Sequence, residues 1–255
     1  MKKLLMAALL VMLLCTACVT NRTRGDAISL LERGKKFAVN EDYDTAIADF
    51  TGAIKLDPKF SAAYNERGST YARRGDYDKA IKDYTKVIRN DPKSTVAYTN
   101  RGNAYFKIHD YEKAIKDYTR VIKLYPNSAA AYYNHDNAGA YYKRGNAYLA
   151  KGEYDKAITD YTKVISISPN YAAAYYKRGN AYYAKTDYDK AIADNTQVIR
   201  IYPESAAAYN SRGSAYYNKE NYDKALDDFT RALEINPDYA LAKRNIEIVR
   251  QAREY

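Results

Sequence analysis

The dipeptide Arg-Gly recurs along the chain at a nearly fixed spacing, and this period constrains the fold more than any other feature. Six of its copies form a series with intervals of 34, 34, 43, 34 and 34 residues. The six arginines are Arg33, Arg67, Arg101, Arg144, Arg178 and Arg212. A proline follows each copy in step, at Pro58, Pro92, Pro126, Pro169, Pro203 and Pro237. A fixed period of this length predicts a solenoid of stacked, similar units.

The third unit shows what each period folds into. Tyr98, Gly102 and Tyr105 lie three to four residues apart, which places them on one stripe of a helix. The segment "HDYEKA" breaks that helix, and Asp110 is the expected N-cap of a second helix with an apolar stripe over 114–122. We call the two helices of a unit helix A and helix B. Neither can bury its apolar face alone, but stacked hairpins can.

The residues of each unit follow one pattern of an aromatic, Gly, aromatic, Ala, aromatic and Pro at fixed offsets. In the second unit these are Tyr64, Gly68, Tyr71, Ala80, Tyr84 and Pro92. In this pattern the chain resembles the tetratricopeptide repeat family over residues 27–239. It departs from the pattern at Leu30, in place of the first aromatic, and at Asn195, in place of the last. The resemblance implies an all-α fold, a right-handed α-solenoid of six tetratricopeptide helix hairpins plus a C-terminal capping helix.

We therefore expect six segments along the chain. They are a signal peptide (1–17), a lipidated tether (18–26), repeats 1–3 (27–128), a nine-residue insert (129–137), repeats 4–6 (138–239) and a capping helix (240–255). The last of these, "ALAKRNIEIVRQAREY", lacks the repeat glycine and is polar on one side, as the end of a solenoid requires.

The one irregular interval contains a small duplication, "AAAYY" followed by "AGAYY" nine residues later. Nine residues are about two and a half turns at roughly 3.6 residues per turn, so one unbroken helix would point Tyr132 and Tyr141 to opposite sides. We therefore expect a short helical turn and then a loop at 134–139, with Asp136 or Asn137 capping the next helix. Two interpretations stay open: a tolerated neutral insertion, or a displayed loop that binds a partner.

The N-terminus predicts export. Lys2 and Lys3 precede eleven apolar residues, 4–14, which are too few to span a bilayer and typical of a signal-peptide core.

The residues around Cys18 resemble the lipobox of bacterial lipoproteins, because small residues directly precede the cysteine. This resemblance implies lipid attachment at Cys18, although Cys15 stands where that family usually has Leu. The alternative is ordinary cleavage after Ala17. Val19 is not the Asp that favours retention at the inner membrane in related lipoproteins. The expected location is therefore the bacterial cell envelope, lipid-anchored at the periplasmic face of the outer membrane, or otherwise secreted or periplasmic.

The sequence offers no arrangement of catalytic or metal-binding residues. The two histidines, His109 and His135, stand apart from any cysteine of the mature chain, and neither a phosphate-binding glycine loop nor zinc spacing occurs. We expect no enzyme activity, no metal site and no cofactor. The formal net charge is +10, and charged residues of both signs are scattered along the chain, so no single basic patch is evident. The export signal argues against a nucleic-acid partner.

A second polar residue recurs sixteen positions after each repeat arginine. These residues are Asp49, Asp83, Asp117, Asp160, Asp194 and Asp228. Because the arginine lies on helix A and the aspartate on helix B, we predict a ladder of ion pairs between the helices. Such pairs specify register more than they add stability. The alternative is a row of arginines that binds anions.

The family's concave groove is lined by helix A positions two, five, nine and twelve. Carried onto this chain, that rule gives candidate partner-binding residues at three of those positions: Asn65, Asn103, Asn146, Asn180, Asn210, Tyr142, Tyr176, Tyr183 and Tyr217. We expect a neutral groove whose amides pair with an extended peptide backbone and whose rings supply contact area. The predicted function is a non-enzymatic protein–protein scaffold or adaptor of the cell envelope, held to the membrane by its N-terminal lipid. The alternative is a small-ligand-binding accessory protein of an envelope transporter.

Overall fold

The computed structural model describes residues 23–124 and 131–253, and in these ranges the chain forms thirteen helices and no strand. The predicted all-α solenoid of helix hairpins is confirmed. The predicted signal peptide, and Cys18 with it, lies outside the described residues. The chain divides into two compact units, residues 1–120 and 121–255, and the division falls inside one helix, α6.

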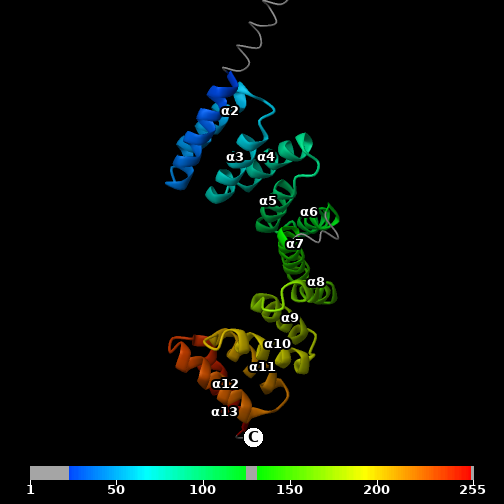
Figure 1. Ribbon diagram of the computed structural model, residues 1–255. Helices are drawn as coiled ribbons and strands as arrows, with labels where there is room; N and C mark the ends of the chain where they lie inside the picture. Colours follow the sequence, from blue (N-terminus) through cyan, green and yellow to red (C-terminus); the bar gives the residue numbers. More distant parts are fainter. Residues whose placement is uncertain (1–22, 125–130, 254–255) are drawn as a thin grey trace, which may run out of the picture. The chain divides into compact units, whose positions relative to one another are not determined.

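The N-terminal unit is a stack of antiparallel hairpins (Figure 1). Its helices span 23–39, α2 (Tyr43–Leu56), α3 (Ser61–Arg74), α4 (Tyr77–Asn90), α5 (Thr95–Lys107) and the first part of α6 (Tyr111–Leu124). The predicted cap of α6 is confirmed, because the backbone N–H of Lys113 donates to Asp110 Oδ1 at 3.2 Å.

The C-terminal unit repeats the same hairpin and closes on a single helix. Its helices after α6 are α7 (Ala131–Ala150), α8 (Tyr154–Ile167), α9 (Ala172–Ala184), α10 (Tyr188–Ile201), α11 (Ala206–Asn218), α12 (Tyr222–Ile235) and α13 (Ala240–Arg253). The last helix, α13, packs on α12 and α11, where Ile246 and Val249 bury against Ala225 and Phe229.

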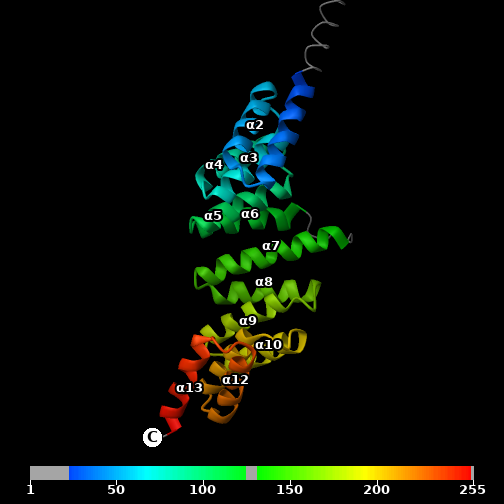
Figure 2. The same ribbon diagram turned by 90° about the vertical axis from the view of Figure 1, so that its left-hand side faces the viewer.

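The predicted loop at 134–139 is wrong, because α7 runs unbroken from Ala131 to Ala150. Figure 2 shows α7 as one rod along α8 that reaches past one of its ends. The segment is built largely from Ala and Tyr, and Asn137 and Gly139 each disfavour a helix by no more than about 1 kcal/mol. Burial of Asn137, Ala138 and Ala140 supplies the packing that offsets this cost. Neither Asp136 nor Asn137 is therefore an N-cap, and the extra residues lengthen helix A of repeat four.

The glycine of each helix A lies against the side chain that helix B presents at the last aromatic position. A Cβ built on Gly145 would come within 2.8 Å of Tyr161 Cε1, closer than real Cβ contacts allow. The equivalent pairs are Gly34 with Phe50, Gly68 with Tyr84, Gly102 with Tyr118, and Gly213 with Phe229, at 2.7–2.9 Å. Only a hydrogen fits there, so the glycine sets how closely the two helices of a repeat approach.

The two glycines of α7 give a matched test of this contact. Gly139 has no atom within 4 Å of a built Cβ, so Gly139→Ala should stabilise the protein by about 0.5–1 kcal/mol through helix propensity alone. Gly145→Ala should instead destabilise it by about 1–3 kcal/mol, because the methyl group overpacks against Tyr161. Thermal and urea unfolding of both variants would measure this. Stabilisation by both would mean that the ring is not in tight contact with the glycine.

Candidate functional site

The predicted ion-pair ladder is confirmed in all six repeats. In the fifth, Arg178 Nε and Nη2 donate to the two carboxylate oxygens of Asp194 at 2.9 and 2.7 Å. The equivalent pairs are Arg33–Asp49, Arg67–Asp83, Arg101–Asp117, Arg144–Asp160 and Arg212–Asp228. Each aspartate is buried, so the carboxylate of this two-bond ion pair is shielded from solvent. The arginines are engaged inside the hairpins and do not form an open anion-binding row.

Several of these arginines also contact the preceding hairpin. Arg178 Nη1 donates to Thr162 Oγ1 on α8 at 2.9 Å, so one guanidinium joins α8, α9 and α10. The same bond joins Arg67 to Thr51, Arg101 to Thr85, and Arg212 to Thr196. The repeat arginine therefore sets the register both within a hairpin and between neighbouring hairpins.

The pKa shifts of this pair show the two opposing electrostatic effects. The hydrogen bond to Asp194 raises the pKa of Arg178 above its usual value. Burial raises the pKa of Asp194, although its bond to the guanidinium acts in the opposite direction. The carboxylate thus costs free energy to bury even beside its partner, which fits a role in specifying register.

The contact between hairpins predicts a measurable difference between two threonines. Thr162 accepts the bond from Arg178, whereas Thr230, at the same repeat position on α12, makes no side-chain hydrogen bond to any described residue. Both are exposed, so intrinsic helix propensity affects them alike. Thr162→Ala should lower the free energy of unfolding by about 0.5–1 kcal/mol relative to Thr230→Ala. Equal values in chemical denaturation would show that the bond between hairpins contributes nothing to stability.

Two of the predicted groove asparagines bind rings of their own hairpin. Tyr118 Oη donates to Asn103 Oδ1 at 2.9 Å, and Tyr161 Oη donates to Asn146 Oδ1 at 2.8 Å. These amide oxygens therefore position the buried tyrosines. Two further asparagine pairs join neighbouring hairpins or the cap: Asn100 of α5 donates to Asn65 of α3, and Asn245 of the capping helix α13 donates to the buried Asn210 of α11.

The predicted groove tyrosines differ in how deeply they pack. Tyr176 is half-buried against a cluster of Ala172, Val198 and Ala208, so it belongs in part to the core. Tyr142 lies edge-on to Tyr171. Truncating either ring would therefore disturb packing as well as any bound partner.

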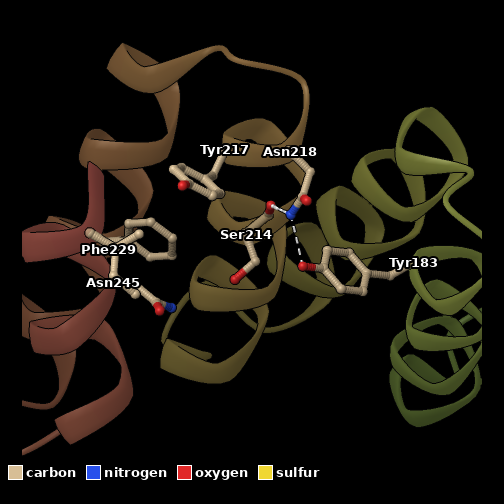
Figure 3. Close-up of a pocket in the computed structure, with 7 residues that line it drawn as sticks. Tyr183, Ser214, Tyr217, Asn218, Phe229 and Asn245 are labelled. Carbon is tan, nitrogen blue, oxygen red and sulfur yellow. Dashed lines mark hydrogen bonds between the residues drawn. The ribbon is translucent and has the colours of Figure 1, made fainter. Parts of the chain in front are cut away.

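Tyr183 is the exposed member of the set, and with Tyr217 it lines a hollow between α9, α11, α12 and α13 (Figure 3). The hollow has a volume of about 260 Å³. Asn218 Nδ2 donates to Tyr183 Oη at 2.8 Å and to the Ser214 carbonyl at 2.9 Å, which fixes the ring at the rim. Phe229 and Asn245 complete the walls that Figure 3 labels. A second cavity, of about 200 Å³, shares Tyr183 and Ser214 and is lined further by Asn180, Asn195 and Ser211.

The N-terminal unit has a cavity of a different character. It has a volume of about 340 Å³ and is lined by Ser69, Ala72, Arg73, Tyr77, Tyr84, Asn100, Asn103, Ala104 and Lys107. Arg73 and Lys107 are exposed cations at equivalent positions of α3 and α5, one residue beyond the last predicted groove position. The expectation of a neutral groove is therefore wrong for this unit. The spacing of 34 residues between Arg73 and Lys107 is a sequence signal that could have predicted these two cations.

Of the helices in 23–124 and 131–253, none is both long and apolar enough to cross a bilayer. The same residues contain no cluster of three or more His, Cys, Asp or Glu with the geometry of a metal site.

Family profiles match most of the chain. Profiles described as tetratricopeptide repeat match residues 31–95, 95–128, 172–205 and 206–239, and one described as TPR repeat matches 145–186. The chain belongs to the tetratricopeptide repeat family. The fold of this family is typically a non-enzymatic scaffold for protein interactions.

Solved tetratricopeptide repeat structures agree with this assignment. The crystal structure of MamA protein is 32% identical to the chain, with a TM-score of 0.62, over 71% of this chain and 93% of that one. YrrB, a TPR protein with an unusual peptide-binding site, is 22% identical with a TM-score of 0.63, over 76% and 96%. Pseudomonas aeruginosa pilF is 14% identical with a TM-score of 0.65, over 88% and 97%; these last two likenesses concern the fold alone. Among curated proteins, no match was found.

Proposed function

We propose that the protein is a non-enzymatic scaffold that holds an extended segment of a partner protein in the groove of its C-terminal unit. The observation that carries this proposal is the pair of adjoining cavities that share Tyr183 and Ser214. Together they offer hydroxyls, amides and an exposed aromatic ring along successive helices A, which suits a peptide backbone with alternating side chains. The peptide-binding site of the structural neighbour YrrB supports the same class of partner.

The location that we propose is the bacterial cell envelope, with a lipid on Cys18 as the membrane anchor. The basic and apolar N-terminal residues and the small residues before Cys18 support this proposal. We propose that the anchor holds the repeats at the periplasmic face of the outer membrane, where partners would be other envelope proteins.

Site-specific photocrosslinking tests the groove. A photoreactive phenylalanine in place of Tyr183 should crosslink a partner in cells of the native host at least fivefold more than one in place of Tyr202. Tyr202 is 61% exposed at the end of α10 and lines none of the three described cavities, so it controls for surface reactivity. In the same cells, Tyr183→Ala should weaken capture of that partner at least tenfold, or about 1.4 kcal/mol. Equal crosslinking at both positions would contradict a partner site in this groove.

The anchor is tested by the cysteines. Cys18→Ser should shift the mature protein from the detergent phase to the aqueous phase of a two-phase extraction, because the thiol that carries the lipid is gone. Cys15→Ser is the matched control and should leave the protein in the detergent phase. Mass spectrometry of the wild-type N-terminus should show acyl chains on Cys18; a free, unmodified N-terminal cysteine would contradict the proposal.

A further inference from the structure

The cavity of about 340 Å³ in the N-terminal unit and the hollow of about 260 Å³ in the C-terminal unit occupy equivalent places in their repeats. Three pairs of equivalent residues line both: Ser69 and Ser214, Tyr84 and Phe229, and Asn100 and Asn245. The two cavities differ at the end of helix A, where Ala72 and Arg73 stand in place of Tyr217 and Asn218. The N-terminal cavity is therefore a wider and charged version of the same hollow.

The charge of this cavity has one sign. Among the described residues that line it, Arg73 and Lys107 are cations and none is acidic. Arg73 lies in the last turn of α3 and Lys107 in the last turn of α5, at the same position of helix A in repeats two and three. The other repeats carry Val39, Ala150, Ala184 and Asn218 at this position. Cations therefore occur there only in the two repeats whose helices A form the cavity.

Neither cation is neutralised by the described part of the chain. Arg73 and Lys107 are exposed, and neither forms an ion pair or a side-chain hydrogen bond with a described residue. The next residue after Arg73 behaves differently, because Arg74 binds Asp44 and Asp76 at 2.5 Å each. The two cavity cations are therefore available to a negative group from outside the chain.

A third hydrogen-bond donor lies in the wall between the two cations' helices. Tyr84 Oη donates to Ser69 Oγ at 3.3 Å, and Ser69 Oγ donates to no described residue. Burial raises the pKa of Tyr84, and the positive charge of Arg73 acts in the opposite direction, so the guanidinium lies within electrostatic range of this part of the wall. Glu66 also raises the pKa of Tyr84, but it does not line the cavity. The cavity thus offers a hydroxyl, a guanidinium and an ammonium group, which are donors that a carboxylate accepts from.

The exposure of the cations indicates what kind of anion fits. Water and salt weaken an exposed ion pair, so a small free anion held only by these side chains would bind poorly. A protein segment adds backbone and side-chain contacts to the ion pairs, and a cavity of about 340 Å³ accommodates a side chain with the adjoining backbone. The cations also follow the groove positions on successive helices A, along which an extended segment would lie.

We propose that this cavity binds an acidic segment of a partner protein, with the carboxylate of one Asp or Glu side chain held between Arg73 and Lys107. The hydroxyl of Ser69 donates a hydrogen bond to the same carboxylate. This inference goes beyond the proposed function, because it assigns a second contact, of different chemistry, to the N-terminal unit. It does not depend on the groove beside Tyr183.

The first test uses two short labelled peptides of glycine and serine, one with a pair of central glutamates and the other with glutamines in their place. Fluorescence anisotropy with the purified full chain should give an affinity at least tenfold higher for the glutamate peptide. Arg73→Ala with Lys107→Ala should weaken that peptide at least tenfold and leave the melting temperature unchanged, because both side chains are exposed. Equal affinities for the two peptides would overturn the proposal.

The matched control is Lys55→Ala with Arg89→Ala. It also removes one lysine and one arginine that are exposed and 34 residues apart, but these two lie on α2 and α4 and line none of the three described cavities. This variant should bind the glutamate peptide as wild type does. An equal loss in both double variants would mean that the overall charge of the chain attracts the peptide, and the site would be refuted.

The second test reverses the charge of the site. Arg73→Glu with Lys107→Glu should bind a peptide with a pair of central lysines at least tenfold more tightly than wild type does, and no gain would contradict the proposal. Glutarate that displaces the labelled peptide as effectively as the unlabelled peptide does would replace the segment with a free small anion. A phosphoserine peptide that binds at least tenfold more tightly than the glutamate peptide would reassign the site to a phosphorylated segment. These measurements use the purified chain and synthetic peptides, so their outcome is separate from that of crosslinking at residue 183 in cells.

Discussion

The contact between a helix A glycine and a helix B ring determines how each repeat is built. It brings the two helices so close that only a hydrogen fits on the glycine, as at Gly145 against Tyr161. At that separation the repeat arginine of helix A reaches the buried aspartate of helix B with both arms of its guanidinium, as Arg144 reaches Asp160. Packing therefore sets the distance, and the ion pair sets the register.

The sequence alone was sufficient for the features that recur with the period. The hairpins, the Asp110 cap and the arginine–aspartate ladder each follow from residues that stand at fixed offsets, and stacking identical offsets produces identical contacts. Periodicity predicts these contacts because the same residue types pack against one another in every repeat.

The features that the sequence did not predict are those where tertiary packing overrides a local signal. The residue types of Asn137 and Gly139 predict a loop, but the burial of Ala138 and Ala140 keeps α7 continuous. The groove residues were placed by position, but their partners were not foreseen. Whether an asparagine oxygen meets solvent or a tyrosine hydroxyl, as Asn146 does, depends on how far a ring from the other helix reaches.

The departures from the repeat are the features that make the two units different. The N-terminal unit places Arg73 and Lys107 beside its cavity, whereas the cavities of the C-terminal unit have neutral walls with an exposed ring at Tyr183. Asn195 replaces the helix B ring of repeat five, so the most regular contact of the fold is interrupted beside the cavities where we place the partner.

The central claim is that the contact between glycine and ring sets the helix separation at which the ion pair of each repeat forms, and a crystal structure of Gly145→Ala tests it most directly. In that structure α7 should lie farther from α8, and at least one of the two hydrogen bonds between Arg144 and Asp160 should be lost. In a crystal structure of Gly139→Ala, where a built Cβ meets no atom within 4 Å, both bonds should be unchanged. An unchanged helix separation with both bonds intact in Gly145→Ala would contradict the account.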